Sequence, residues 1–83
     1  MPSLSELPGE IKRSRFLRAL MRLGFLISET GGNGSHYKAT WPSTQKAVII
    51  EYKLPKQTLK YLIKEIEDIT EGGVTWEKIR ENL

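Results

Sequence analysis

The chain has 83 residues, a formal net charge of +3, one histidine and no cysteine. This length supports one small domain with a modest core, and the lack of cysteine excludes disulfides and thiol catalysis. No apolar run is long enough to span a bilayer, and the first residues lack the basic-then-apolar order of a signal peptide. We therefore expect a cytoplasmic protein that does not contact a membrane.

Charge is distributed unevenly along the chain. Residues 1–64 carry eleven basic and four acidic side chains, a net charge of +7, whereas residues 65–83 carry two and six, a net charge of −4. A basic body suggests a polyanionic partner, most simply a nucleic acid. The alternative is that the lysines and arginines only solvate helix faces, and composition leaves both interpretations open.

The N-terminal third predicts an irregular arm followed by a helix. Residues 1–13 contain two prolines and a glycine, which indicates an arm with one turn at most. A helix is expected from Ser14, a good N-cap, to Leu23, because Gly24 is placed to end it. Its expected buried stripe is Leu17, Leu20 and Met21, with Phe16 beside it. A second face carries arginines at helical spacing: Arg15, Arg18 and Arg22.

The middle of the chain predicts three antiparallel strands joined by tight turns, over residues 25–28, 35–41 and 46–52. The second strand alternates, so that Tyr37, Ala39 and Trp41 should face the core. The same alternation places His36 and Lys38 together on the open face of the sheet.

The last third predicts two helices. Residues 56–69 form the longer helix, which ends before Gly72-Gly73 and has a row of lysines at i, i+4 and i+8. Residues 74–83 form a short helix that either packs on the domain or contacts a partner, and packing is favoured because an exposed Trp76 is unfavourable. The apolar stripe of the longer helix is Leu59, Leu62, Ile63 and Ile66, and its lysine row is Lys56, Lys60 and Lys64.

These elements predict an α+β fold, with helices packed on one face of a three-stranded antiparallel sheet in a single domain, residues 1–83. The sheet would then carry a candidate site at the glycine-rich turn over residues 31–34. Such a turn exposes backbone N–H groups that can hold an anion. His36 follows, and histidine is the residue type suited to proton transfer at neutral pH. A phosphate cradle beside an acid/base suits phosphodiester cleavage, although a solvated loop with a surface histidine is a common alternative.

The order of elements and several short motifs resemble the HicA family, the small toxins of bacterial HicA–HicB toxin–antitoxin pairs. The matching motifs are Leu20-Met21-Arg22-Leu23-Gly24-Phe25, then Gly34-Ser35-His36, then Thr58-Leu59 and Leu62-Ile63 in the second helix. Together they span about residues 14–66. Three departures are visible: Glu51-Tyr52-Lys53 stands where many members have a second histidine, Gln57 replaces a frequent glycine, and the loop before Gly34 is glycine-rich where many members have a basic residue.

The resemblance implies a fold like that of double-stranded-RNA-binding domains and an mRNA interferase of a type II toxin–antitoxin system. Such an enzyme cuts mRNA without a metal and is silenced by a HicB-type antitoxin. His36 would be the catalytic acid/base, and Lys38 with the backbone of Gly34 and Ser35 would stabilise phosphoryl charge. The arginine and lysine rows would bind the RNA backbone.

Two other functional classes remain open. A non-catalytic RNA-binding module would need only the basic rows, and a protein-interaction module would use the basic surface for an acidic partner. No cofactor is expected, because one histidine and no cysteine leave too few ligands for zinc. The glycine turn also lacks the Lys-Ser/Thr of a Walker loop.

Overall fold

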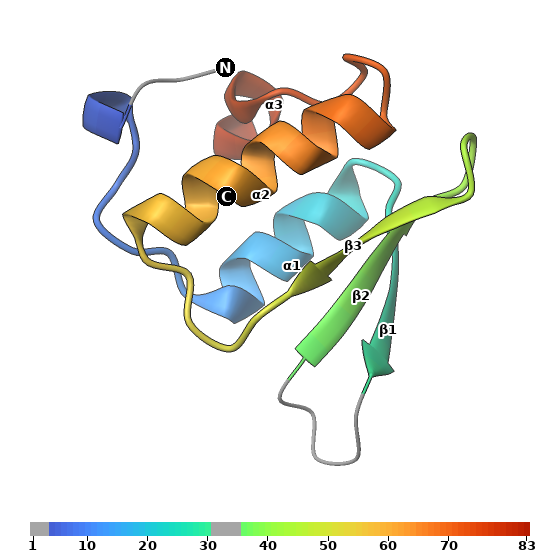
Figure 1. Ribbon diagram of the computed structural model, residues 1–83, viewed down its shortest axis with the longest axis horizontal. Helices are drawn as coiled ribbons and strands as arrows, with labels where there is room; N and C mark the ends of the chain where they lie inside the picture. The colour runs from blue at the N-terminus through green and yellow to red at the C-terminus, as the bar shows by residue number, and fades with distance from the viewer. Residues whose placement is uncertain (1–3, 31–35) are drawn as a thin grey trace.

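The computed structural model describes residues 4–30 and 36–83. They form an α+β fold in which helices lie beside a three-stranded antiparallel sheet (Figure 1). The order of elements confirms the predicted one and adds a short 3₁₀ turn in the arm. In chain order the elements are η1 (Leu4–Glu6), α1 (Arg13–Arg22), β1 (Leu26–Thr30), β2 (His36–Trp41), β3 (Lys46–Ile50), α2 (Lys56–Ile69) and α3 (Trp76–Glu81).

The sheet is a meander with the strand order β1-β2-β3. Ala39, at the centre of β2, pairs with Ile27 of β1 and with Val48 of β3. The β2–β3 turn is closed by a hydrogen bond of 2.8 Å from the backbone N–H of Gln45 to the carbonyl of Trp41. This register fixes which side chains share a face, because side chains alternate along each strand.

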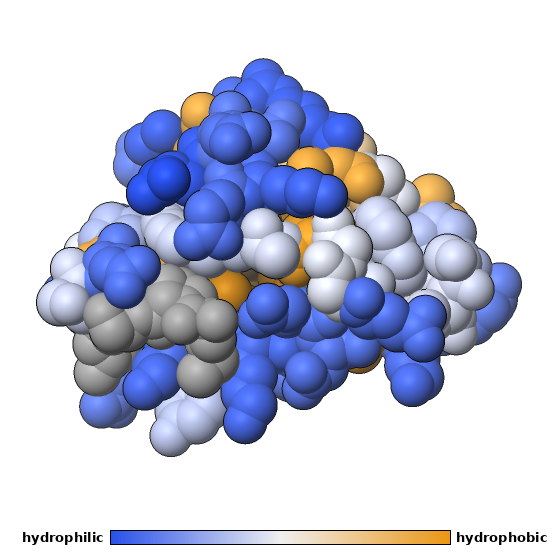
Figure 2. Space-filling view, turned by 90° about the horizontal axis from the view of Figure 1, so that it is seen from above, coloured by the Kyte–Doolittle hydropathy of each residue, from blue (hydrophilic) through white to orange (hydrophobic). Residues whose placement is uncertain are grey.

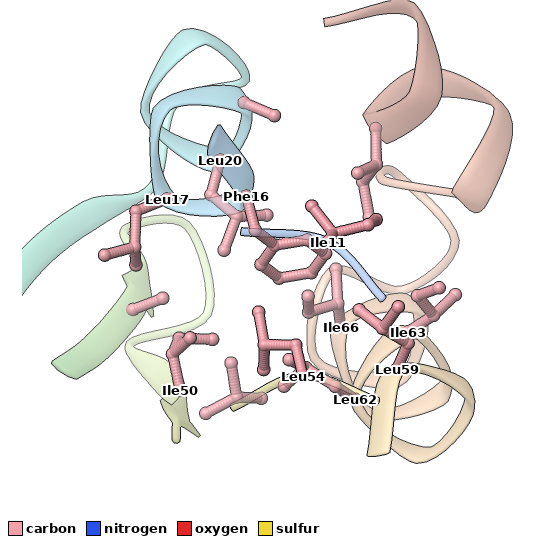
Figure 3. Close-up of a cluster of buried hydrophobic side chains, with 14 of the residues drawn as sticks. Ile11, Phe16, Leu17, Leu20, Ile50, Leu54, Leu59, Leu62, Ile63 and Ile66 are labelled. Atoms are coloured by element: carbon pink, nitrogen blue, oxygen red, sulfur yellow. The ribbon is translucent and has the colours of Figure 1, made fainter. Parts of the chain in front are cut away.

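One face of the sheet is buried by both α1 and α2. Ala39, Val48 and Ile50 point into the core, where the predicted stripe of α2 meets them. Figure 3 shows the ring of Phe16 pointing from α1 into the space between the helices and the sheet. Tyr37 and Trp41 are half-buried and pack against this core, as the alternation predicts. All four predicted stripe residues of α2 are buried: Leu59, Leu62, Ile63 and Ile66.

The N-terminal arm is part of the core, which the sequence did not indicate. Leu7 and Ile11 are buried within it, and Glu10 forms an isolated β-bridge with Pro55. The bridge holds the arm against the connection between β3 and α2. Burial of two branched side chains offsets the conformational entropy lost in ordering an arm with little regular structure.

Two details of α1 correct the sequence prediction. The helix begins at Arg13 with Lys12 as N-cap, so Ser14 lies inside its first turn and does not cap it. Met21 is also exposed, at 52% of its surface. The buried arc of α1 is centred on Phe16 and Leu20, because the helix packs against α3 as well as the sheet, and Met21 lies at its rim.

Gly24 ends α1 in a Schellman motif. The backbone N–H of Phe25 bonds to the carbonyl of Leu20 at 3.0 Å, and the N–H of Gly24 bonds to the carbonyl of Met21 at 3.1 Å. Gly24 has a φ of 108°, a conformation that side chains rarely adopt. Phe25 and Leu20 are both buried, so the Leu-Gly-Phe motif is a helix stop with its accompanying apolar contact.

Replacement of Gly24 by alanine is expected to lower the free energy of unfolding by roughly 1–3 kcal/mol. The cost comes from the backbone, since a Cβ here would lie 3.6 Å from the Trp41 ring, an ordinary contact. Urea denaturation measures the effect. Gly9→Ala is the control, because Gly9 has open space and no positive φ, and an equal loss in both variants would contradict the assignment.

The C-terminal residues pack on the domain, as the sequence favoured. Trp76 and Ile79 of α3 are buried, and Arg22 donates a hydrogen bond of 2.8 Å to the carbonyl of Asn82. Between α2 and α3, the hydroxyl of Thr70 donates to the carbonyl of Ile66 and accepts from a backbone N–H. Over the described residues, no helix has the length and apolarity needed to cross a membrane.

Candidate nucleic-acid interface

His36 is the first residue of β2 and lies exposed at the end of the sheet. Its backbone partner on β1 is Thr30. The alternation along β2 directs its side chain to the face opposite Ala39, away from α1 and α2. Gly34 and Ser35, the expected backbone cradle, lie outside the described residues.

Lys38 shares this outer face with His36. It is exposed and lies between Ser28 on β1 and Ile49 on β3. The predicted placement of His36 and Lys38 on the open face is therefore confirmed. This arrangement puts an imidazole at the end of the sheet and an ammonium group two residues along the same strand face, which is suited to contact with a phosphate chain.

The rest of the outer face is mixed in character. Leu26 is 62% exposed and Ile49 is 50% exposed, on either side of β2. Ile49 also lines a shallow hollow together with residues of α2. An extended chain can lie across such a face and contact His36, Lys38 and the apolar groups together.

The structure does not bring the predicted basic rows to His36. Both rows belong to helices that cover the buried face of the sheet, so they lie on the other side of it from His36. Arg22 is engaged with Asn82, and Arg15 lines a hollow toward α3 together with Arg80. Figure 2, which views the molecule from above, shows mostly hydrophilic side chains over this helical side. Of the rows, Arg15, Arg18, Arg22 and Lys64 are exposed, and Lys56 and Lys60 are half-exposed.

A further cation, Arg13, contacts the residue that follows His36 in β2, and sequence reasoning missed it. The guanidinium carbon of Arg13 lies 4.7 Å from the ring centre of Tyr37 and 4.9 Å from that of Tyr52. Both distances are typical of cation–π contacts. We call this group, Arg13 with Tyr37 and Tyr52, the arginine clamp. It joins the start of α1 to the strand residue that follows His36.

A pocket of about 500 Å³ opens beside the arginine clamp. Its floor includes the aliphatic side chains of Ile11 and Leu17. Three cations and one carboxylate line it, so that its walls carry a net positive charge. The charged lining residues are Glu10, Lys12, Arg13 and Lys53.

Only a weak signal in the sequence points to this pocket. Lys12-Arg13 and Tyr52-Lys53 are adjacent pairs that periodicity assigns to an arm and to a strand end. In the structure β3 ends at Ile50, so Tyr52 and Lys53 lie in the connection to α2 rather than in the strand. The Glu10–Pro55 bridge then brings the arm to this connection.

The described residues contain no group of three or more His, Asp or Glu side chains placed to hold a metal ion. Comparison of the chain with protein-family models, with curated proteins and with solved structures gives no match.

Proposed function

We propose that the chain is a metal-independent endoribonuclease that cleaves mRNA, acting as the toxin of a HicA-type toxin–antitoxin pair. The observation that carries the proposal is the exposed His36 at the end of the open sheet face, with Lys38 beside it. The resemblance of the chain's motifs to those of the HicA family supports the same assignment.

The chemistry needs few groups from the protein. The 2′-oxygen of a ribose attacks the adjacent phosphorus and loses its proton, while the bond from phosphorus to the 5′-oxygen breaks and that oxygen gains a proton. His36 serves as the base or as the acid, and solvent serves in the other role. Lys38 on the same face stabilises the negative charge that develops on the phosphoryl oxygens.

A single acid/base group accelerates a reaction by about 10²–10⁴-fold, so this enzyme should be slow. A HicB-type antitoxin is the expected inhibitor, and it would act by covering the outer sheet face with acidic groups. A complex in which His36 and Lys38 stay solvent-exposed would contradict that mode of inhibition.

One observation favours a second candidate, a non-catalytic RNA-binding module. The predicted basic rows lie on the helical side, away from His36, and could bind a phosphate backbone without any chemistry. In that case, RNA would bind but stay intact. A protein-interaction module is the third reading, for which RNA binding should vanish at physiological salt.

Incubation of a long mRNA with the purified protein in excess EDTA distinguishes these readings. Cleavage should persist in EDTA and give fragments with 5′-hydroxyl and 2′,3′-cyclic phosphate ends. Labelling by polynucleotide kinase without prior phosphatase treatment detects the 5′-hydroxyls. Fragments with 5′-phosphates, or cleavage that stops in EDTA, would contradict the mechanism, and bound but intact RNA would favour the binding module.

A further inference from the structure

We infer that the pocket beside the arginine clamp binds one unpaired nucleotide of a single-stranded RNA, at the end of the sheet where His36 lies. The inference rests on the proposed function and adds the substrate class, because it requires a base that is free to stack. The first support is location. Tyr37 lines the pocket and directly follows His36 in β2, so the pocket and the histidine lie at the same end of the sheet, on its two faces. A strand of RNA that passes around this end of the sheet can contact both.

The second support is the aromatic surface. Tyr52 is 66% exposed although one face of its ring contacts the Arg13 guanidinium. Arg13 also contacts Tyr37, which packs against the core, so the clamp limits the positions available to Tyr52. A large exposed ring held in place is a platform on which a base can stack at low entropic cost.

The third support is charge and size. Lys12, Arg13 and Lys53 outnumber the one carboxylate of the pocket, Glu10, which suits a phosphate group near the start of α1. The volume of about 500 Å³ lies within the range of small-ligand sites. A base on Tyr52 and a phosphate near Lys12 and Lys53 would use the aromatic and the cationic walls together.

The walls of the pocket are also fixed by the fold. The Glu10–Pro55 bridge joins its two walls, the arm and the connection after β3. Each wall is anchored in the core by a buried neighbour, Ile11 on one side and Leu54 on the other. An unpaired base can enter such a pocket, whereas the stacked bases of an A-form duplex cannot leave their helix to reach Tyr52.

The test measures binding separately from cleavage. The probe is a fluorescein-labelled 12-nucleotide single-stranded RNA with 2′-O-methyl groups, which lacks the attacking hydroxyl and stays intact. Tyr52→Ala should weaken binding about 5- to 150-fold, the range for loss of one stacked base. Tyr52→Phe should bind within about twofold of the wild type, since the ring remains. Lys53→Ala should lower the slope of log affinity against log salt by about one.

Matched controls use residues away from the pocket. Tyr61→Ala removes an equally exposed tyrosine, 70% exposed on α2, and Lys46→Ala removes a charge from the far end of β3. Both should bind the probe like the wild type. A Tyr52→Ala variant that binds single-stranded RNA with wild-type affinity would overturn the inference. So would an affinity for a duplex of the same length that depends equally on Tyr52. The inference would also be overturned if only an acidic peptide bound in a Tyr52-dependent way.

Failure of the subsite and failure of the proposed function can be told apart. If the 2′-O-methyl probe binds in a Tyr52-dependent way but unmodified RNA stays intact, the nucleotide subsite is supported and the nuclease assignment is contradicted. If a Tyr52→Ala variant binds RNA with wild-type affinity and cleaves unmodified RNA, the subsite is contradicted and the nuclease assignment is supported.

Discussion

Replacement of His36 by alanine is expected to lower the rate of RNA cleavage by about 10²–10⁴-fold, the contribution of one general acid or base. RNA affinity should change little, because His36 is exposed and the cations of the pocket lie on the other face of β2. Single-turnover cleavage in EDTA, with affinity for the uncleavable 2′-O-methyl probe measured in parallel, separates the two effects.

Thr40→Ala is the matched control for this substitution. Thr40 lies on the same outer face of β2, beyond Lys38, and pairs with Leu26. The Thr40→Ala variant should cleave RNA at the wild-type rate. A His36→Ala variant that is folded by circular dichroism and cleaves as fast as the wild type would remove His36 from the mechanism. Cleavage would then depend on other groups of the protein.

Replacement of Phe16 by alanine is expected to lower the free energy of unfolding by about 3–5 kcal/mol, the usual cost of deleting a core phenylalanine. Phe16 has no exposed surface and points between the helices and the sheet (Figure 3). Small domains have a total stability of about 5–15 kcal/mol, so this loss can unfold a large fraction of the molecules. Urea denaturation followed by circular dichroism measures it.

Met21→Ala provides the contrast within the same helix. The sequence pattern placed Met21 in the buried stripe, but the structure exposes 52% of it. Its replacement should change the free energy of unfolding by no more than about 1 kcal/mol, since surface substitutions have small effects. A loss comparable to that of Phe16→Ala would indicate that Met21 is buried and that the arc assigned to α1 is wrong.

The regular elements could be predicted because their signals are local. The stripe of α2 repeats at helical spacing over its whole length, and its bounds, residues 56–69, agree with the prediction. The meander followed from alternation and turn residues, and β2 ends at Trp41 as predicted, while Ser35, its predicted start, lies outside the described residues. β1 spans Leu26–Thr30 rather than the predicted residues 25–28. The start of α1 was placed wrongly, because Ser14 is a good N-cap by type but Lys12 takes that position.

The candidate site was predictable only in part. Strand alternation placed His36 and Lys38 on one face, and that placement needed no knowledge of the helices. The basic rows belong to helices on the inward face of the sheet, so the predicted layering already separates them from His36. Periodicity describes each helix by itself and does not contain the direction in which each row points in the folded domain.

By itself the sequence determined the element order, the inward face of the sheet and the stop of α1 at Gly24, because each follows from neighbours within a few residues. Only the tertiary structure decided that the arm enters the core and that Arg13 lies between Tyr37 and Tyr52. These contacts join segments far apart in the chain. They form because burial of Leu7, Ile11 and Leu54 stabilises one arrangement of the arm against the sheet, and no local pattern encodes that choice.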